Sequence, residues 1–520
     1  MFIALILRLI SIYIPVIGNK EKLEQQKTLT NKNVKRIPIV DRNNNIIAMD
    51  INIVSLYVQT RLVESTSRMA LKLSEVLNDT EFSYILDRLN SKSKQVLIKR
   101  NITPKERLAV EKLGFAGLIF EDRKTRIYPL NQLLSHFIGY TDVDNNGLAG
   151  LEKQYDEFLK DYHKEKYLKT TIDIKVQGIL REQLALGMLK FNGKSAVGIV
   201  MDVNNGDILG MVSLPDFNPN RSQYSEEYQR FNRATYGVYE MGSIFKIFTA
   251  AMALQKNIAE TNSEYNISEP IKIGKYVIKD KHFTKNNMTV KEIIGYSSNV
   301  GTAKIAIDSG PEIQKEYFKK FGFLNKINAD FPSLGTPIMQ KRWGKINVTT
   351  MSYGHGIAVT PLHITKAFAS IVNDGFITEP RFIIKESIND EGKIVKEEPT
   401  RTKILDEQTS KKLKDILRFV VTHGTGWRAN TLGYLVGGKT GTAEKVVEGE
   451  YSKTKTRATF ICTFPITKPQ YVIFIMIDDP DGEDTGRMNT GGAIAAPIAS
   501  KIIEGIAPIL GVKPVVERIY

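Results

Sequence analysis

The chain has 520 residues, of which 42% are hydrophobic and 25% are charged, and these values are ordinary for a folded globular protein. They exclude extensive disorder, and the length accommodates two or three domains with sizeable cores. The net charge of +15 raises the question of nucleic-acid binding. Because the lysines are scattered and no zinc-finger spacing or RNP-like aromatic strip occurs, we interpret the charge as a general surface bias suited to anionic lipid or an acidic polymer.

Residues 2–17 are apolar except for Arg8 and Ser11, and Pro15 interrupts them. A membrane-crossing helix needs about 20 apolar residues, so this run is short. No basic segment precedes it and no small-residue cleavage site follows it. It can be read as an interfacial segment, a poor signal sequence, or the outer end of a spanning helix whose first part is missing. We favour the third interpretation, with 1–18 as a membrane anchor and the polar 19–35 as a tether.

Residues 36–165 form a first region of short mixed segments. A strand followed by a turn is predicted at 36–44, and helices are predicted at 61–78 and 104–113. The sequence from Asp144 to Gly147 predicts a turn, because Asn and Gly accept positive φ, and it lacks the carboxylate spacing of a calcium loop.

Residues 166–520 follow a different pattern. A helix at 174–189 precedes two apolar runs, 196–201 and 208–212, which flank Asn204-Asn205-Gly206-Asp207 and predict a β-hairpin. Two further apolar runs, at 456–465 and 470–478, precede an apolar helix at 491–510. Strands at both ends of the region with helices between them predict an antiparallel sheet with helices on its faces, an α+β fold.

Cysteine and histidine usage gives no sign of a disulfide or a metal. The single cysteine, Cys462, lies in one of the apolar runs and is predicted to be buried, and it excludes an intrachain disulfide. The six histidines form no His-x-x-x-His or Cys/His cluster. The acidic stretch 478–484 contains Pro and Gly, which favour a solvated turn over a cation site.

The first candidate catalytic element is Ser243-Ile244-Phe245-Lys246. It opens an apolar run to Leu254 that predicts a helix buried in a core, with Ser243 and Lys246 on one face. A serine hydroxyl becomes a nucleophile when a base accepts its proton, and a buried lysine near a second cation has a lowered pKa that suits this role. The alternative is a helix-capping serine with a lysine that extends to solvent, but burying a lysine among apolar neighbours without purpose is unfavourable.

Two further elements complete the candidate site. Ser297 and Asn299 follow a capping box at 289–292, so they are predicted at a helix end, where a hydroxyl can relay a proton and an amide can hold a peptide. Lys439 lies in a glycine-rich stretch that predicts a strand open to a ligand backbone. Lys439 offers a cation for a carboxylate, and Thr440 and Thr442 offer hydroxyls. The backbone N–H groups of Ser243 and Thr442 could form an oxyanion hole.

Each of these elements is weak alone. Ser-x-x-Lys also occurs at Ser91–Lys94 and Ser452–Lys455, and Ser-x-Asn also occurs at Ser387–Asn389. The three elements together are stronger evidence than any one of them, because the sequence around each suits a position in one shared active site. Three such elements in this order are the signature set of β-lactamases and penicillin-binding proteins.

The chain resembles a class B penicillin-binding protein, and within that group the division-specific transpeptidase, over about residues 5–506. The likeness is densest in the segments 232–235, 239–243, 297–301, 341–343, 352–356, 360–361, 424–426 and 437–445. In the first region it is carried by 36–44, Arg126, Tyr128-Pro129, His136, Gly139-Tyr140, Gly147, Gly150 and Glu152. Met241 replaces the usual proline, and Ile37 and Asn44 replace usual glycines.

The resemblance implies a transpeptidase domain of β-lactamase-like α+β fold at 166–520, preceded by an elongated pedestal domain of the dimerisation type at 36–165. It implies septal peptidoglycan cross-linking: Ser243 attacks the penultimate D-alanine of a D-Ala-D-Ala stem peptide, and a neighbouring strand's amine resolves the acyl-enzyme. β-Lactams are expected to acylate Ser243. The implied roles are general base for Lys246, proton relay for Ser297, amide clamp for Asn299, and carboxylate binding by Lys439 with Thr440 and Thr442. Gly441 is implied as a further substrate-binding residue of this strand.

The resemblance also implies no metal or organic cofactor and no nucleic-acid partner. It implies a single-pass protein of the bacterial inner membrane whose catalytic domain lies outside the cytoplasm. The expected partners are division-complex membrane proteins, including a glycosyltransferase.

Several alternatives remain open from the sequence. An elongation-type transpeptidase is the nearest, although 341–343 and 352–356 favour the division type. A β-lactamase would need a carboxylate base for deacylation, and no Glu-x-x-Leu-Asn element occurs between the second and third elements. A lactam-sensing receptor would carry several membrane helices. A catalytically silent division scaffold is disfavoured by intact Ser243, Lys246 and Lys439.

Overall fold

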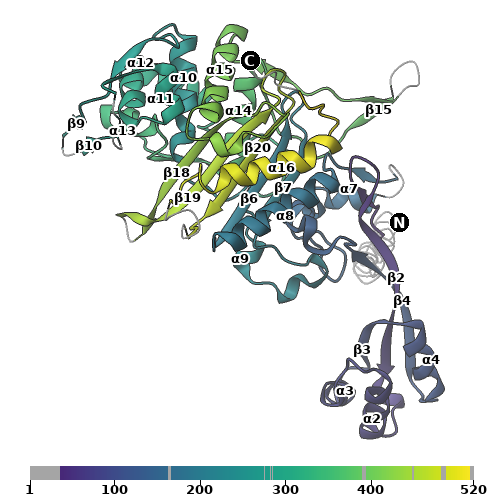
Figure 1. The fold of residues 1–520 in the computed structure, drawn as a ribbon. Helices are drawn as coiled ribbons and strands as arrows, with labels where there is room; N and C mark the ends of the chain where they lie inside the picture. Colours follow the sequence, from purple (N-terminus) through teal and green to yellow (C-terminus); the bar gives the residue numbers. More distant parts are fainter. Residues whose placement is uncertain are drawn as a thin grey trace, which may run out of the picture.

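The computed structural model describes residues 35–161, 166–274, 276–280, 283, 285–388, 394–447, 450–481 and 488–515. The predicted anchor lies outside these ranges, as does the tether apart from Lys35. Among the described residues, no helix combines the length and apolar character that crossing a membrane requires. The described chain forms an α+β body from which a smaller lobe extends on two long strands (Figure 1).

The lobe is built on β2 (Ile46–Gln59), which pairs antiparallel with β3 (Gln95–Ile102) and with β4 (Leu118–Ile127). Its helices are α2 (Thr66–Val76), α3 (Phe82–Leu89) and α4 (Pro104–Lys112). These elements enclose a separate apolar core that includes Leu56, Leu73, Ile85, Val96 and Val110. The lobe therefore has a core of its own, and β2 and β4 connect it to the body (Figure 1).

The predicted helix at 61–78 is divided in the structure. A short 3₁₀ turn, η1 (Thr60–Leu62), ends before α2 begins, because Ser65 caps α2 by accepting a hydrogen bond from the Arg68 N–H. The predicted helix at 104–113 is present as α4, whose start is a capping box formed by Thr103 and Glu106.

At the base of the lobe, β1 (Ile39–Val40) pairs antiparallel with β2 and parallel with β5 (Leu168–Lys169). The turn after β1 is held by Asp41, whose Oδ1 accepts the N–H groups of Asn43 and Asn45 at 2.8 Å each. Asn44 adopts a φ of 67° in this turn. Asparagine tolerates this left-handed conformation, so the turn forms without the glycine that the resembled family has here.

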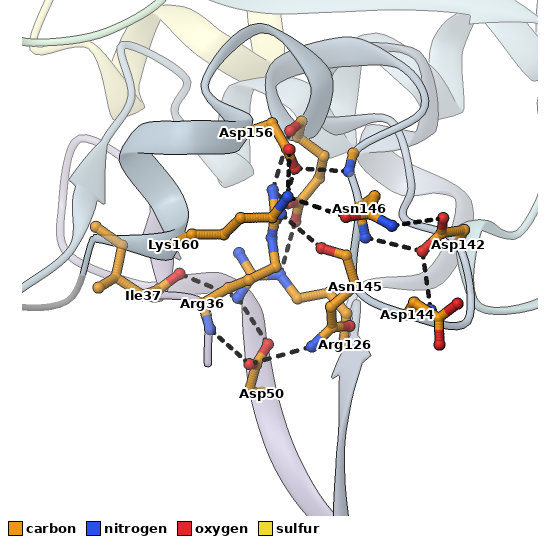
Figure 2. A network of polar contacts seen from close by, with 12 residues as sticks. Arg36, Ile37, Asp50, Arg126, Asp142, Asp144, Asn145, Asn146, Asp156 and Lys160 are labelled. Carbon is orange, nitrogen blue, oxygen red and sulfur yellow. Dashed lines mark hydrogen bonds and ion pairs between the residues drawn. The ribbon is translucent and has the colours of Figure 1, made fainter. Parts of the chain in front are cut away.

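A buried charge network lies where β2 and β4 enter the body (Figure 2). Glu152, on α6 (Gly150–Gln154), accepts from Arg36 Nη2 at 2.6 Å and from Arg126 Nε at 2.7 Å. Arg126 also pairs with Asp50 at 3.1 Å, and Arg36 pairs with Asp156 at 2.5 Å. The network thus joins β2 and β4, the two strands that carry the lobe, to α6 and α7 (Asp156–Lys160).

The body is organised by a five-stranded antiparallel sheet of order β18-β19-β20-β6-β7. The strands are β6 (Ser195–Asp202), β7 (Ile208–Leu214), β18 (Gly437–Val447), β19 (Glu450–Phe464) and β20 (Tyr471–Asp478). The predicted hairpin is β6–β7, and the predicted later pair of strands is β19–β20. Because β20 pairs with β6, the two ends of the region form one sheet, which confirms the α+β prediction.

Helices cover both faces of this sheet. On one face, α8 (Ile174–Lys190) and α16 (Ala495–Ile509) pack on strand residues such as Phe460 and Ile473. On the other, residues such as Ile461 face the core that contains α10 (Phe245–Gln255), α14 (Pro361–Val372) and α15 (Glu407–Thr422). Cys462 is fully buried on the first face, as predicted, and burial raises the pKa of its thiol.

The remaining elements connect these layers. They are η2 (Asn131–Leu134), α5 (Ser135–Ile138), η3 (Pro219–Tyr224), α9 (Glu227–Arg230), η4 (Gly242–Ile244), β8 (Glu264–Asn266), β9 (Ile271–Ile273), β10 (Tyr276–Ile278), β11 (Asn287–Thr289), α11 (Val290–Tyr296), α12 (Asn299–Lys320), β12 (Ile338–Met339), α13 (Lys345–Met351), β13 (Ile357–Ala358), β14 (Phe376–Thr378), β15 (Glu386–Ile388), β16 (Ile394–Lys396), β17 (Arg401–Lys403) and η5 (Trp427–Ala429).

The charge network yields a stability prediction. Glu152→Gln leaves Arg36 and Arg126 buried without their shared carboxylate. We expect this to lower the free energy of unfolding of the β2–β4 segment by about 3–5 kcal/mol. The measurement is hydrogen exchange of β2 and β4 peptides over a urea series. The control is Glu75→Gln, which removes the exposed Lys72–Glu75 pair and is expected to change stability by less than about 1 kcal/mol. Equal midpoints for the two variants would contradict a stabilising role for the network.

Candidate active site

The candidate nucleophile occupies a tight turn. Ser243 lies in the 3₁₀ turn η4, and α10 begins two residues later, so Ser243 precedes the helix that the sequence predicted it would open. Lys246 lies in the first turn of α10 and is fully buried, with Phe245 and Phe248 also buried on this helix. The prediction of a helix buried nearly all round is confirmed.

Two lysines from distant parts of the chain converge on the Ser297 hydroxyl. Lys246 Nζ donates to Ser297 Oγ at 3.1 Å and to the Ser297 carbonyl at 2.5 Å. Lys439 Nζ, from β18, lies 3.2 Å from Ser297 Oγ and 3.0 Å from the Thr440 carbonyl. A hydroxyl carries one donor and two acceptor positions, so Ser297 can pass a proton between its two amine neighbours.

Burial controls the charge of both amines. Lys439 is fully buried, and this desolvation lowers its pKa to about 7. Burial lowers the pKa of Lys246 well below its usual value, and the charge of Lys439 lowers it further, whereas Asp280 acts in the opposite direction. Each of the two amines is therefore a weaker base than a solvated lysine. Near neutral pH the pair can supply one basic amine and one cation.

The position of Ser297 depends on an unusual backbone conformation. Ser297 follows the predicted capping box of α11 and ends that helix with a φ of 66°. Ser298 then caps α12 by accepting the Gly301 N–H at 2.8 Å. The second element thus forms the junction of two helices, in agreement with the predicted helix end.

Asp280 is a site residue that the sequence did not reveal. Its carboxylate accepts the Ser298 hydroxyl at 2.5 Å and the N–H groups of Asn299 and Val300 at 2.5 and 3.2 Å. A carboxylate at the start of a helix is favourable because the helix dipole and the free N–H groups point toward it. Asp280 therefore fixes the helix junction, but its position next to Lys279 in a polar stretch gave no signal of this contact.

Strand β18 lies directly against the nucleophile turn. A Cβ placed at Gly242 would lie 2.4 Å from the Thr442 carbonyl oxygen, and one placed at Gly441 would lie 2.6 Å from the Met241 carbonyl oxygen. Only glycine permits such close backbone approach, which explains the glycine-rich stretch. The third element thus lies beside the first.

The threonine hydroxyls of β18 are already engaged. Thr440 Oγ1 lies 2.7 Å from Thr425 Oγ1, and Thr442 Oγ1 accepts the Gly491 N–H at 3.1 Å. Both hydroxyls are thereby oriented. Thr425 lies in a segment of family likeness, and its contact with Thr440 depends on tertiary packing that the sequence does not show.

The structure brings together most of the predicted site. Lys246, Ser297 and Lys439 are in contact, and Gly441 and Thr442 lie against the turn that carries Ser243. Within the part of the chain that the structure describes, neither the Ser243 hydroxyl nor the Asn299 side chain makes a hydrogen bond. The two lysines contact the hydroxyl of Ser297 and not that of Ser243.

The other occurrences of the short motifs lie outside this arrangement. Lys94 and Lys455 are both exposed to solvent. Asn389 lies outside the described residues. The described residues contain no cluster of three or more His, Cys, Asp or Glu side chains that could hold a metal ion.

Comparison with known proteins agrees with this geometry. The family model "Penicillin binding protein transpeptidase domain" matches residues 196–504, and "Penicillin-binding Protein dimerisation domain" matches residues 31–183. The probable peptidoglycan D,D-transpeptidase FtsI of Caulobacter vibrioides is 33% identical, over 92% of this chain and 82% of that protein. Stage V sporulation protein D of Bacillus subtilis is 32% identical, over 92% and 79%.

A solved structure shares the fold. Penicillin Binding Protein 2X from Streptococcus thermophilus superposes with a TM-score of 0.75 at 22% sequence identity, and the match covers 92% of this chain and 80% of that one. Both the lobe and the body thus belong to a known architecture.

The close approach of β18 to the turn yields a testable prediction. Gly441→Ala would bring a Cβ within 2.2 Å of Thr459 Oγ1 and 2.6 Å of the Met241 carbonyl, so β18 must move away from Ser243. We expect labelling by fluorescent penicillin to slow about 100-fold, since a shift near 1 Å has effects of this size.

The matched control is Gly178→Ala on α8, where an added Cβ meets nothing within 4 Å. It is expected to leave labelling unchanged and to stabilise the helix by up to about 1 kcal/mol. Equal labelling of the two variants would show that the contact between β18 and the turn is dispensable.

Proposed function

Because the chain belongs to the penicillin-binding protein transpeptidase family, which works through a serine acyl-enzyme, we propose that it is the septal peptidoglycan D,D-transpeptidase of its cell. The observation that carries this proposal is the pair of buried lysines on either side of the Ser297 hydroxyl, next to the Ser243 turn. The Caulobacter relative, a probable peptidoglycan D,D-transpeptidase, supports the reaction class.

Acylation starts at Ser243. Its Oγ attacks the carbonyl carbon of the penultimate D-alanine of a stem peptide, and Lys246, as the neutral amine, takes the hydroxyl proton. The N–H groups of Ser243 and Thr442 stabilise the oxyanion. The C–N bond to the terminal D-alanine breaks, and the proton reaches that leaving amine from Lys246 through the Ser297 hydroxyl. The products are the acyl-enzyme and free D-alanine.

Substrate binding relies on the β18 edge. Lys439, as the cation, holds the terminal carboxylate of the stem peptide, with Thr440 and Thr442 as additional donors along the glycine-rich strand. Gly441 lets the peptide backbone approach the strand. The Asn299 side chain, which has no hydrogen bond among the described residues, is free to hold the substrate amide. A bound carboxylate stabilises the protonated form of Lys439.

The second half-reaction transfers the acyl group. An amine of a neighbouring stem peptide attacks the Ser243 ester, a new amide bond forms, and Ser243 regains its proton. β-Lactams present a strained amide to the same serine, so they acylate Ser243 by the first half-reaction.

The cellular setting follows from the same proposal. Residues 1–18 anchor the protein in the inner membrane, and the domains 36–165 and 166–520 lie outside the cytoplasm. The partners are membrane proteins of the division complex, including a glycosyltransferase that makes the glycan strands. The elongation-type transpeptidase and a catalytically silent scaffold remain the competing functions.

The catalytic assignment is tested by replacing the nucleophile. Ser243→Ala is expected to abolish covalent labelling by penicillin, because no other hydroxyl lies in the same turn. Mass spectrometry of the labelled wild-type protein should place the adduct on the peptide that contains Ser243. Ser91→Ala, in the surface Ser-x-x-Lys motif, is the control and should label normally. Undiminished labelling of Ser243→Ala would end the assignment and favour the scaffold.

The lowered lysine pKa values predict a bell-shaped pH dependence of the acylation rate constant kcat/KM. Lys246 must be unprotonated to act as the base, so the rate rises as the pH increases through its lowered pKa. Lys439 must be protonated to bind a carboxylate, so the rate falls as the pH increases through about 7. Stopped-flow acylation by a chromogenic cephalosporin measures the profile. A rate that keeps rising up to about pH 10 would mean that both lysines have ordinary pKa values.

A further inference from the structure

A carboxylate next to the nucleophile turn has no role in the reaction described above. Glu240 lies three residues before Ser243. Its Oε1 accepts the Gly356 N–H at 2.7 Å and the Tyr451 hydroxyl at 3.1 Å. Its Oε2 is buried, and among the described residues no hydrogen-bond donor contacts it. A buried carboxylate oxygen without a donor is unfavourable, which indicates a position that a ligand completes.

The backbone around Glu240 is fixed against the active site. The preceding residue, Tyr239, exchanges two hydrogen bonds of 2.9 Å with Val359. A Cβ placed at Gly354 would lie 2.1 Å from the Gly242 carbonyl oxygen, so the loop that donates to Glu240 packs on the nucleophile turn itself. Thr249 of α10 also donates to the Ser352 carbonyl at 2.8 Å. Glu240 is therefore held at the edge of the Ser243 site.

Two cations of β18 and β19 pair with another carboxylate. Lys445 and Arg457 both pair with Asp478, at 2.8 and 3.1 Å. Among the described residues, no lysine, arginine or histidine forms an ion pair with Glu240. Glu240 thus has no ion-pair partner among the described residues, at the edge of a site that also holds the two amines at Ser297.

The ring side chains beside Glu240 pack against one another and carry little charge. His355 contacts Tyr353 and Tyr451 edge to face, with ring centroids 5.3 and 5.4 Å apart. Burial lowers the pKa of His355, while Glu240 and Glu444 oppose this effect. The imidazole is therefore largely uncharged at neutral pH and does not neutralise Glu240. Tyr451 contacts Glu240 through its hydroxyl, so the ring groups here place no positive charge against the carboxylate.

The second half-reaction supplies such a group. An acyl acceptor is a primary amine, and in neutral solution it arrives as an ammonium ion. The donor peptide ends in a carboxylate and is matched by Lys439, so the two substrates carry opposite charges toward the serine. A site that binds both the donor peptide and the acyl acceptor therefore needs a negative charge where the acceptor binds.

We propose that Glu240 binds the ammonium group of the acyl acceptor through its unpartnered Oε2, with Tyr451 and His355 forming the wall of this subsite. The inference rests on the proposed function, because it concerns the acceptor of that same reaction. Glu240 acts on binding of the second substrate and takes no part in the attack of Ser243 on the donor.

The test compares two acceptors with different charge. Full-length protein is acylated with a soluble acyl-D-alanyl thioester, and the acyl-enzyme is partitioned between water, D-alaninamide and hydroxylamine. D-Alaninamide is largely cationic at neutral pH, whereas hydroxylamine is largely uncharged. For Glu240→Gln we expect KM for D-alaninamide to rise about 10-fold or more, which matches the loss of one hydrogen bond to a charged group. Transfer to hydroxylamine and acylation by penicillin should stay within about 2-fold of wild type.

Two further variants separate binding from folding. Glu240→Asp keeps the charge and should recover part of the D-alaninamide transfer, which a purely structural role would not predict. Glu504→Gln, an exposed carboxylate paired with Lys501, is the matched control and should behave as wild type.

Each outcome decides between explanations. Equal loss of both acceptors, or a Glu240→Gln protein that penicillin no longer acylates, means that Glu240 only shapes the turn and overturns the proposal. Unchanged D-alaninamide transfer also overturns it. If the wild-type protein itself is not acylated by penicillin or by the thioester, the proposed function fails instead, and this result is separate from the acceptor test.

Discussion

The chemistry of this protein depends on two lysine amines that are buried on either side of one serine hydroxyl. Lys246 and Lys439 are 193 residues apart in the chain, yet both contact Ser297 Oγ at 3.1–3.2 Å. Without water to solvate them, two such amines cannot both stay charged at low cost, so one becomes a base near neutral pH. The free energy for this arrangement must come from the surrounding fold.

Several parts of the fold hold the two amines and the Ser297 hydroxyl in place. Helix α10 buries Lys246 in an apolar core, and β18 brings Lys439 to the edge of a five-stranded sheet. The Ser297 conformation, with a φ of 66°, is held by the helix junction that Asp280 caps. The lobe contributes none of these contacts. It has its own core and is joined to the body through the Arg36–Glu152–Arg126 network and through Ile47 and Ala48 of β2, which belong to the body core.

The sequence predicted the parts whose determinants are local. The hairpin around Gly206, the helix at 174–189, the capping box before Ser297 and the burial of Lys246 all depend on residues close in the chain. The division of the helix at 61–78 could have been foreseen from Ser65, a residue type that favours helix starts. The lobe's long strand β2 was not predicted, because its paired residues lie 36–48 residues away in β3 and 60–78 residues away in β4.

Prediction of the site from the sequence was limited in the same way, because its contacts join residues far apart in the chain. Ser243, Ser297 and Lys439 were identified by motif, but the convergence on Ser297 rather than on Ser243 follows from tertiary packing. Asp280 has no sequence signature, and Glu240 lies in a segment of family likeness that assigns it no role. The importance of both residues comes from which N–H groups and hydroxyls the fold places near them. Such residues become visible only when hydrogen-bond partners are counted in three dimensions.

The central claim is that Lys246 is an uncharged amine in the folded protein near neutral pH. NMR of protein with ¹⁵Nζ-labelled lysine, assigned with Lys246→Gln and Lys439→Gln variants, measures each titration directly. We expect Lys246 to titrate well below the ordinary lysine pKa and Lys439 to titrate near 7. A Lys246 resonance that titrates near 10.5, the value of a solvated lysine, would contradict it.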